Sequence, residues 1–297
     1  MTLEDYLYNK HQKSTADRYL RDIKAYLAEE PEAKRATYSD IINYLSRLRK
    51  RYSNKATVNR ILHSIKKYYE YLTRTNQIQT NPAKNIHLKN YRNKDLQLQD
   101  LFTTKELESL LTETNWARKT NATRNKVIIS LLIYQALTRQ ELTRLQTYQI
   151  DLEKATIKLP ETPKSNAREL PLKPNQIMLF YKYMNEDRMK LLRKNQSDLS
   201  TEASAKEDMF LIDWHGKPVT EDVIRTLLEY CKRFFPEKNL NATTIRMSVI
   251  ANLLKEGKDL RMVQAFAGHK YPSTTERYKQ NHIEELKQQI EKYHPLQ

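Results

Sequence analysis

The sequence predicts a mainly α-helical protein with one small antiparallel β-sheet, built as two domains. Apolar residues recur at helical spacing through the first 85 residues, which is typical of short amphipathic helices. Two β-like runs, at 155–160 and 168–172, flank a polar turn and predict a hairpin. The 297 residues are enough for two cores, and only three glycines are present, which argues against a glycine-rich phosphate loop or a dinucleotide fold.

Residues 1–85 are the first predicted domain, a set of short helices. The third of these helices is expected to begin at Thr57 and Val58, and Asn81-Pro82 is expected to end the domain. The apolar faces that define the helices are Ala16, Tyr19, Leu20, Ile23 and Leu27, then Ile41, Tyr44, Leu45 and Leu48, then Ile61, Ile65, Tyr68, Tyr69 and Leu72.

A polar, aperiodic segment at 86–101 is interpreted as a linker, and residues 102–297 as the second domain. Thr103 or Thr104 is expected to cap the first helix of that domain, because Glu106 then falls in its first turn.

The middle of the second domain alternates apolar and charged stretches. The apolar helical stretch at 126–145 is expected to break near Gln135. The segment 185–208 is charged and poor in apolar residues, which favours an exposed insertion, and 209–214 is a candidate short strand. Thr220 is expected to begin another helix.

The last part of the chain predicts two further helices. Thr243 or Thr244 is expected to cap one of them, and Gly257 is expected to end it. The apolar face of the C-terminal helix is Ile283, Leu286 and Ile290.

The net charge of +16, from 52 Lys and Arg against 36 Asp and Glu, favours a polyanionic partner. The segment 41–69 carries eight basic residues and no acidic one. A solvated basic face and a surface that follows phosphates both fit this cluster; the motif described below favours the second. The eight residues are Arg47, Arg49, Lys50, Arg51, Lys55, Arg60, Lys66 and Lys67.

Cysteine and hydropathy patterns exclude several classes of protein. The single cysteine, Cys231, excludes an internal disulfide and is expected to be core filler, and no cysteine cluster offers a metal site. The longest apolar run, 127–134, is far shorter than a membrane span, and the N-terminus lacks the apolar segment of a secretory signal. These patterns predict a cytoplasmic protein without a metal or a membrane partner.

The segment 243–278 carries the residues with the most specific chemistry. Arg246 lies early in a helical pattern, His269 follows 23 residues later in a Gly-His pair, and Tyr278 comes nine residues after His269. A phenol titrates near ~10, so it becomes a useful nucleophile when fixed cations stabilise charge on phosphate oxygens and another group moves protons. A guanidinium, an imidazole and a phenol are therefore a candidate set for attack on a phosphodiester.

In order and spacing, Arg246, the Gly268-His269 pair and Tyr278 resemble the C-terminal motif of the tyrosine recombinase (phage integrase) family, H-x-x-R-H, then L-G-H, then the nucleophilic tyrosine. The resemblance implies a helical core-binding domain at 1–85 and a catalytic domain at 102–297. It also implies that Tyr278 attacks DNA to give a 3′-phosphotyrosyl link and a free 5′-hydroxyl. Arg246 is expected to hold the scissile phosphate, and His269 either to donate to the same phosphate or to assist proton transfer.

The resemblance extends to Lys164, which lies in the predicted hairpin turn where the family has a lysine that protonates the departing 5′-oxygen. Because the phosphotyrosyl link conserves bond energy, the resemblance implies no ATP, metal or other cofactor. It implies double-stranded DNA as the partner, and four protomers on two DNA sites. The C-terminal helix is expected to dock in cis or on a neighbouring protomer.

Two positions depart from the family pattern. Thr243 stands at the first histidine, and a gapless match to the family's G-L-R-x-x-E-L run puts Thr138 at the first arginine. A hydroxyl cannot replace a bidentate cation, and one lost transition-state contact costs about 3 kcal/mol. Arg139, one residue on and about 100° around a helix, is the candidate substitute if the segment is locally non-helical, and Arg144 is a more distant one. Glu141 is available to hold a neighbouring group by hydrogen bonds.

Three functions remain open from the sequence. The first is a site-specific recombinase or integrase of a mobile element, cutting and rejoining DNA through Tyr278. The second is a recombinase-like DNA-binding protein that has lost efficient cleavage, which Thr138 and Thr243 favour. The third is a type IB topoisomerase, which shares the chemistry but suits the compact length and small helical N-terminal domain less well.

Overall fold

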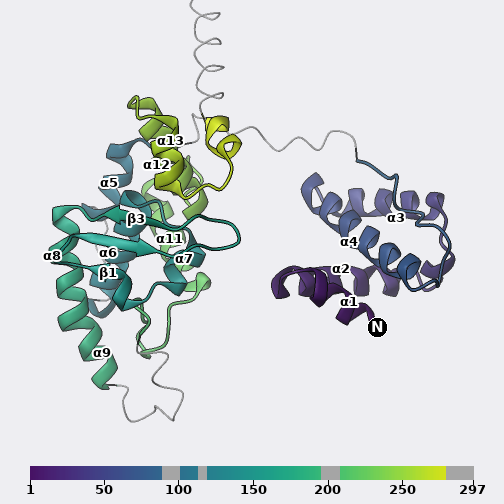
Figure 1. Ribbon diagram of the computed structural model, residues 1–297, viewed down its shortest axis with the longest axis horizontal. Helices are drawn as coiled ribbons and strands as arrows, with labels where there is room; N and C mark the ends of the chain where they lie inside the picture. Colours follow the sequence, from purple (N-terminus) through teal and green to yellow (C-terminus); the bar gives the residue numbers. More distant parts are fainter. Residues whose placement is uncertain (89–100, 113–118, 195–207, 279–297) are drawn as a thin grey trace, which may run out of the picture. The chain divides into compact units, whose positions relative to one another are not determined.

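The computed structural model describes residues 1–88, 101–112, 119–194 and 208–278 (Figure 1). The chain divides into two compact units, Met1–Asp95 and Leu96–Gln297. In the described residues both units are mainly helical, and the second contains a three-stranded antiparallel sheet. The predicted fold class is therefore confirmed. The predicted linker at 86–101 falls largely outside the described residues.

In the N-terminal unit, the described helices pack around one apolar core. The core includes tyrosines whose polar ends are satisfied: the Oη atoms of Tyr26 and Tyr69 lie 2.6 Å apart, and Tyr69 donates to the backbone oxygen of Ala33 at 2.8 Å. A phenol with a hydrogen-bond partner can be buried at little cost. The helices are α1 (Leu3–Lys10), α2 (Lys13–Glu29), α3 (Tyr38–Arg51) and α4 (Lys55–Arg74), with a 3-10 turn, η1, at Ala33–Arg35.

The start of α4 differs from the prediction. The helix begins at Lys55 because Asn54 is its N-cap and its side chain accepts from the backbone nitrogen of Ala56 at 2.9 Å. The start predicted at Thr57 and Val58 is wrong by two to three residues. A short amide side chain satisfies the first free N–H groups earlier in the chain.

The second unit combines helices with the small sheet, in the order β1-β2-β3. The predicted hairpin is formed by β2 and β3, which pair Leu159 with Arg168 and Ile157 with Leu170, and β1 adds to the other edge of β2. No helix in the described ranges is long and apolar enough to cross a membrane. The strands are β1 (Ile150–Asp151), β2 (Thr156–Leu159) and β3 (Arg168–Pro171). The helices are α5 (Thr104–Thr112), α6 (Lys119–Tyr134), α7 (Arg139–Arg144), α8 (Pro174–Lys182), α9 (Arg188–Lys194), α11 (Glu221–Cys231), α12 (Ala242–Lys255) and α13 (Leu260–Ala267), with short turns η3 (Thr147–Gln149), η4 (Tyr183–Asp187) and η6 (Lys232–Phe234).

Helix α6 runs through the core of the second unit and packs against α5, α8 and α12. Its Val127, Ile128 and Leu131 are fully buried. The chain leaves the helix at Gln135 and takes a positive φ of 51° at Ala136 before α7 begins. The predicted break near Gln135 is therefore confirmed, and it matters because the backbone oxygen of Ala136 becomes part of the candidate site.

The predicted insertion at 185–208 is described only at 185–194 and at 208, and its first part is helical. Helical structure continues from α8 through the π-helical turn η4 into α9, up to Lys194. Arg188 is only 7 % exposed and donates to the backbone oxygen of Met209 at 3.0 Å, so a charged residue acts here as an anchor. Residues 195–207 lie outside the described residues.

Two smaller predictions are also corrected. Met209 and Ile212 form only isolated bridges, the latter with Pro218, which has no N–H to extend a ladder, so 209–214 is not a regular strand. Helix α12 is capped by Asn241, whose side chain accepts from Thr244 at 3.0 Å, and not by either threonine. The helix does end just before Gly257, as predicted. The predicted C-terminal helix lies outside the described residues.

Candidate active site

Arg246 brings three segments of the second unit together. From α12, its Nη1 donates to the backbone oxygen of Ala136, and its Nη2 donates to that of Ala267 at the end of α13. Both acceptors are neutral, so they orient the guanidinium without cancelling its charge. Burial lowers the pKa of Arg246, an effect that the charge of Glu141 opposes. An arginine remains charged in proteins, so this site has a fixed cation.

His269 is placed by the end of α13. Gly268 adopts a left-handed conformation with φ 68° and lets the backbone nitrogen of His269 bond to the oxygen of Gln264 at 3.0 Å. The ring nitrogen Nδ1 lies 2.8 Å from the hydroxyl oxygen of Thr275, which is fully buried. Burial lowers the pKa of His269 to about 4, helped by the charges of Arg246 and Arg168. The imidazole is therefore neutral at pH 7.

Tyr278 lies against His269, with ring centroids 6.5 Å apart and ring planes 11° from parallel. It is partly buried and packs against a small cluster formed by Ile250, Val263 and Ala267. Burial raises the pKa of Tyr278, and the charges of Arg246 and Arg277 act in the opposite direction. The phenol is protonated at neutral pH, so a nucleophilic Tyr278 must lose its proton during the attack.

The β2–β3 hairpin docks on the turn that carries His269. The backbone nitrogen of Asn166 donates to the oxygen of Gly268 at 2.9 Å, and Ser165 forms a bridge with His269. Lys164, in the same turn, is exposed. The sequence-predicted lysine therefore belongs to a loop that is fixed beside the arginine, histidine and tyrosine.

Thr138 has a structural task. It is the N-cap of α7, where its hydroxyl lies 2.9 Å from Oε2 of Glu141 and its backbone nitrogen donates to the same oxygen at 2.8 Å. The other carboxylate oxygen of Glu141 accepts from Nη1 of Arg168 at 2.7 Å. Burial alone would raise the pKa of Glu141, but the hydrogen bond and charge of Arg168 outweigh it and hold that pKa below its usual range.

Sequence reasoning missed Arg168 and Thr275 as members of this site. Arg168 opens β3 with a side chain only 4 % exposed, facing Gly268. In the Arg-x-Leu-Pro-Leu run Arg168 lies on the same strand face as the buried Leu170, two residues on, and this period of two was the available signal. No pattern in the sequence pointed to Thr275.

The two remaining sequence candidates are not gathered into the site. Arg139 pairs with Glu221 of α11, its Nε 3.6 Å from Oε2, with both side chains 44 % exposed. Thr243 is exposed in the first turn of α12.

Cys231 is buried, and burial raises the pKa of its thiol to about 12, as expected for core filler.

The basic cluster of the N-terminal unit is partly neutralised by carboxylates that the sequence pattern did not include. Four of the eight residues form ion pairs: Arg47 with Glu30, Arg51 with Glu29, Arg60 with Asp22 and Lys67 with Glu70. Lys66 donates to the backbone oxygen of Lys84 at 3.2 Å. In the described part of the chain no ion pair involves Arg49, Lys50 or Lys55.

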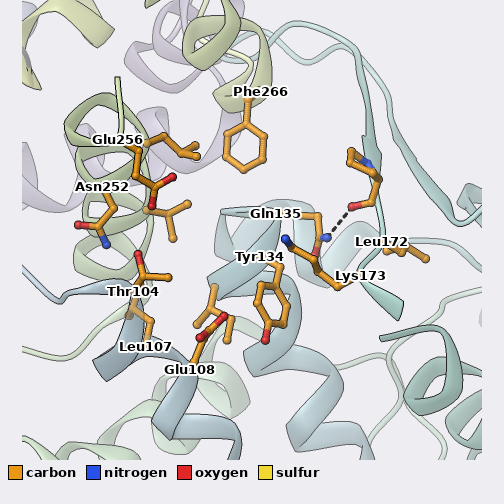
Figure 2. A pocket seen from close by; sticks show the side chains of 14 residues that line it. Thr104, Leu107, Glu108, Tyr134, Gln135, Leu172, Lys173, Asn252, Glu256 and Phe266 are labelled. Atoms are coloured by element: carbon orange, nitrogen blue, oxygen red, sulfur yellow. Dashed lines mark hydrogen bonds between the residues drawn. The ribbon is translucent and has the colours of Figure 1, made fainter. Parts of the chain in front are cut away.

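A separate pocket of about 420 Å³ in the second unit does not suit a phosphate (Figure 2). Glu108 and Glu256 line it, against one cation, Lys173. Its wall is ordered by the buried Gln135, which donates to the backbone oxygen of Pro171 at 2.9 Å. Among the described residues no cluster of His, Cys, Asp or Glu could hold a metal ion.

The protein thus has a helical N-terminal unit and a second unit in which Arg246, His269 and Tyr278 lie together. The profile of the phage integrase family matches residues 100–285, and that of the phage integrase N-terminal SAM-like domain matches residues 3–76. The chain belongs to the phage integrase family, the tyrosine recombinases.

Relatives and solved structures agree with this assignment. The chain is 28 % identical to the tyrosine recombinase XerD of Oceanobacillus iheyensis, over 95 % of this chain and 92 % of the relative, and 27 % identical to XerC of Listeria innocua, over 97 % and 93 %. The Tn1549 transposon integrase in complex with transposon right end DNA is similar in fold, with a TM-score of 0.66 at 15 % identity, over 96 % of this chain and 99 % of that one. The XerH site-specific recombinase bound to a difH substrate gives a TM-score of 0.67 at 19 % identity, over 86 % and 72 %.

Proposed function

We propose that this protein is a site-specific DNA recombinase that cleaves and rejoins DNA through a 3′-phosphotyrosyl intermediate on Tyr278, in the service of a mobile element. The observation that carries the proposal is the arrangement of Arg246, His269 and Tyr278 at one point of the second unit. Arg246 is held there by backbone oxygens, so its charge remains available for a phosphate.

The proposed reaction balances within the DNA and the protein. Oη of Tyr278 forms a bond to the scissile phosphorus, and the bond from phosphorus to the 5′-oxygen breaks. The phenol proton leaves, and a proton reaches the departing 5′-oxygen. One phosphoester bond replaces another, so rejoining of the DNA is the same step in reverse.

The proton movements have candidates in the site. His269 is neutral, and its Nδ1 is engaged by Thr275, so Nε2 is the nitrogen left to accept from Tyr278 or to bond a phosphate oxygen. Lys164, on the docked hairpin turn, is the proposed donor to the 5′-oxygen. Arg246 would stabilise the charge that develops on the non-bridging oxygens.

Double-stranded DNA is the proposed partner, as it is for the XerH and Tn1549 proteins named above. A groove of about 550 Å³ in the N-terminal unit supports this, because its lining carries four cations against the single carboxylate of Glu70. These cations are Lys66, Lys67, Arg74 and Lys84. Several protomers, four on two DNA sites, form the proposed assembly.

The alternative is a DNA-binding protein with impaired cleavage. Thr138 favours it, because the residue at the family's first arginine caps a helix and offers no cation. The conjunction of Lys164, Arg246, His269 and Tyr278 speaks against it, since binding alone does not need all four.

Covalent trapping tests the proposal. The full chain is incubated with nicked DNA that carries a site selected for binding from a random pool, and adducts are separated on a denaturing gel. Wild type should form an adduct, and Tyr278→Phe should form none while binding DNA with nearly unchanged affinity.

Tyr271→Phe is the matched control, because Tyr271 lies in the same segment and is 71 % exposed. It should form the adduct at the wild-type rate. An equal adduct with Tyr278→Phe would remove Tyr278 as the nucleophile, and binding without an adduct in wild type would favour the DNA-binding alternative.

A further inference from the structure

The guanidinium of Arg168 has one partnered nitrogen and one unpartnered edge. Nη1 donates to Oε1 of Glu141 at 2.7 Å and to the hydroxyl of Ser165 at 2.9 Å, which uses both of its N–H groups. Nε and Nη2 are buried and have no hydrogen-bond partner among the described residues. Three of the five N–H donors of this side chain are therefore unsatisfied.

An unsatisfied buried donor in a folded protein needs an explanation. Here the unpartnered nitrogens are adjacent, because Nε–H and one Nη2–H point in the same direction from the planar group. This edge matches two oxygens of a phosphate or carboxylate. The described residues supply no such acceptor to it, so the edge is shaped for a ligand with two oxygens.

The edge belongs to the site that holds Tyr278. A Cβ placed on Gly268 would lie 2.7 Å from Nη1 of Arg168, so the arginine packs directly against the turn that carries His269. The charge of Arg168 also acts on both His269 and Arg246. Two arginines thus share a neighbourhood with one carboxylate, Glu141, and an excess of one positive charge remains.

Glu141 connects this arrangement to the departure at Thr138. One carboxylate oxygen holds the Thr138 cap, and the other holds Arg168. The cation that is absent from position 138, the N-cap of α7, is thus matched by one in the same hydrogen-bonded unit, on β3.

We propose that Arg168 binds the scissile phosphate through its Nε and Nη2 edge, and supplies the second cation of the site where Thr138 supplies none. This inference rests on the proposed function. In it, Glu141 is a positioning residue that fixes the plane of the guanidinium, and Arg168 contacts the reacting group.

The competing explanation is that Arg168 only pins the hairpin to α7. The test must therefore remove the guanidinium without leaving Glu141 as an unpaired buried charge. The double variant Glu141→Gln/Arg168→Met does so, and Glu141→Gln alone is its reference. Arg168→Lys is a second variant, which can keep the ion pair but lacks the fork. Thermal unfolding of each full chain checks that it is folded.

Each protein is measured on DNA with a normal scissile phosphate and on DNA with a methylphosphonate there, in both diastereomers. The methylphosphonate has no charge for an arginine to neutralise. On normal DNA the double variant should form adduct about 10²-fold more slowly than Glu141→Gln. On the methylphosphonate this difference should shrink to about threefold or less. Arg168→Lys should show a defect of the same kind.

If Arg168 has only a structural role, the double variant should be slowed equally on normal DNA and on the methylphosphonate. That outcome would overturn the proposal. Arg225→Met is the control for loss of one positive charge, since Arg225 pairs on its own helix with Asp222 and Glu229. It should show the same rate ratio as wild type on the two substrates.

DNA affinity separates failure of this inference from failure of the proposed function. If wild type forms no adduct, the proposed function fails. DNA affinity is then measured on sites in which one phosphate at a time is replaced by a methylphosphonate. Arg168 still binds a phosphate if replacing one particular phosphate weakens the DNA affinity of Glu141→Gln about 10-fold but does not change the affinity of the double variant. If every replacement affects the two proteins equally, the inference is overturned.

Discussion

The two units of the chain place their arginines in different surroundings. In the N-terminal unit Arg47, Arg51 and Arg60 of α3 and α4 each meet a carboxylate that comes from α2 or the residue after it. Among the described residues of the second unit, Arg246 donates only to backbone oxygens, while Arg168 pairs with one carboxylate and keeps an unpartnered edge. The charge counted along the sequence therefore overestimates how many arginines of the N-terminal unit are free to bind a phosphate. In the second unit the fold leaves the charge of the arginines available.

The largest effect is expected where Arg168 meets Gly268. Gly268→Ala should lower the free energy of unfolding by about 2–4 kcal/mol, as seen by denaturant unfolding. The new Cβ would lie 2.5 Å from Oγ of Ser165 and 2.7 Å from Nη1 of Arg168, and the residue has φ 68°. The same change should also slow adduct formation, because it displaces the docked hairpin.

Gly257→Ala separates backbone strain from this contact. Gly257 has φ 81°, and nothing lies within 4 Å of its added Cβ. It should lose only about 1–2 kcal/mol, with no effect on adduct formation. Equal losses in the two variants would mean that the hairpin does not pack closely on Gly268.

A smaller effect is expected from the cations of α3. Arg49→Gln should weaken binding of the selected DNA about 3- to 10-fold at low salt and reduce the salt slope by about one, because Arg49 has no ion pair among the described residues. Arg51→Gln should change affinity less than about threefold, because Glu29 already engages Arg51 at 2.7 Å. Affinity measured over a range of salt concentrations compares the two, and equal slopes would show that pairing with α2 does not decide which cations reach DNA.

The sequence was sufficient for the fold because its signals are local. Helical spacing predicted α2, α3 and α4 of the first unit and α6 of the second, and Gly257 was correctly identified as a helix end. Asn81-Pro82 does not end the first domain, because Ala83 and Ile86 still pack in its core. Errors at helix starts arose where two polar residues competed as caps, as at Asn241 and Thr244. The paired carboxylates of α2 could not be predicted, because spacing along one helix does not say which face meets another.

At the candidate site, the sequence motif pointed to Arg246, His269 and Tyr278 but not to the contacts that hold them. Thr138 shows the difference: the Thr-x-x-Glu pattern to Glu141 is the signature of a capping box, which the structure contains. This pattern in the sequence indicates a helix start at Thr138, whereas the match to the family motif considered that position only as the place of an arginine. The proximity of Arg168 to Gly268 depends on how the hairpin docks, a contact between residues 100 positions apart.

The smallest effect is expected at Arg139, the substitute cation that the sequence favoured. Arg139→Gln should leave adduct formation within about twofold of wild type and stability within about 0.5 kcal/mol. Its partner in the structure is Glu221, and the pair is exposed. Glu221→Gln removes the same pair from the other side and should match it in both measurements. A loss of about 10² in adduct formation for Arg139→Gln alone would mean that Arg139 leaves Glu221 for the phosphate when DNA binds, and the second cation would then come from α7 and not from β3.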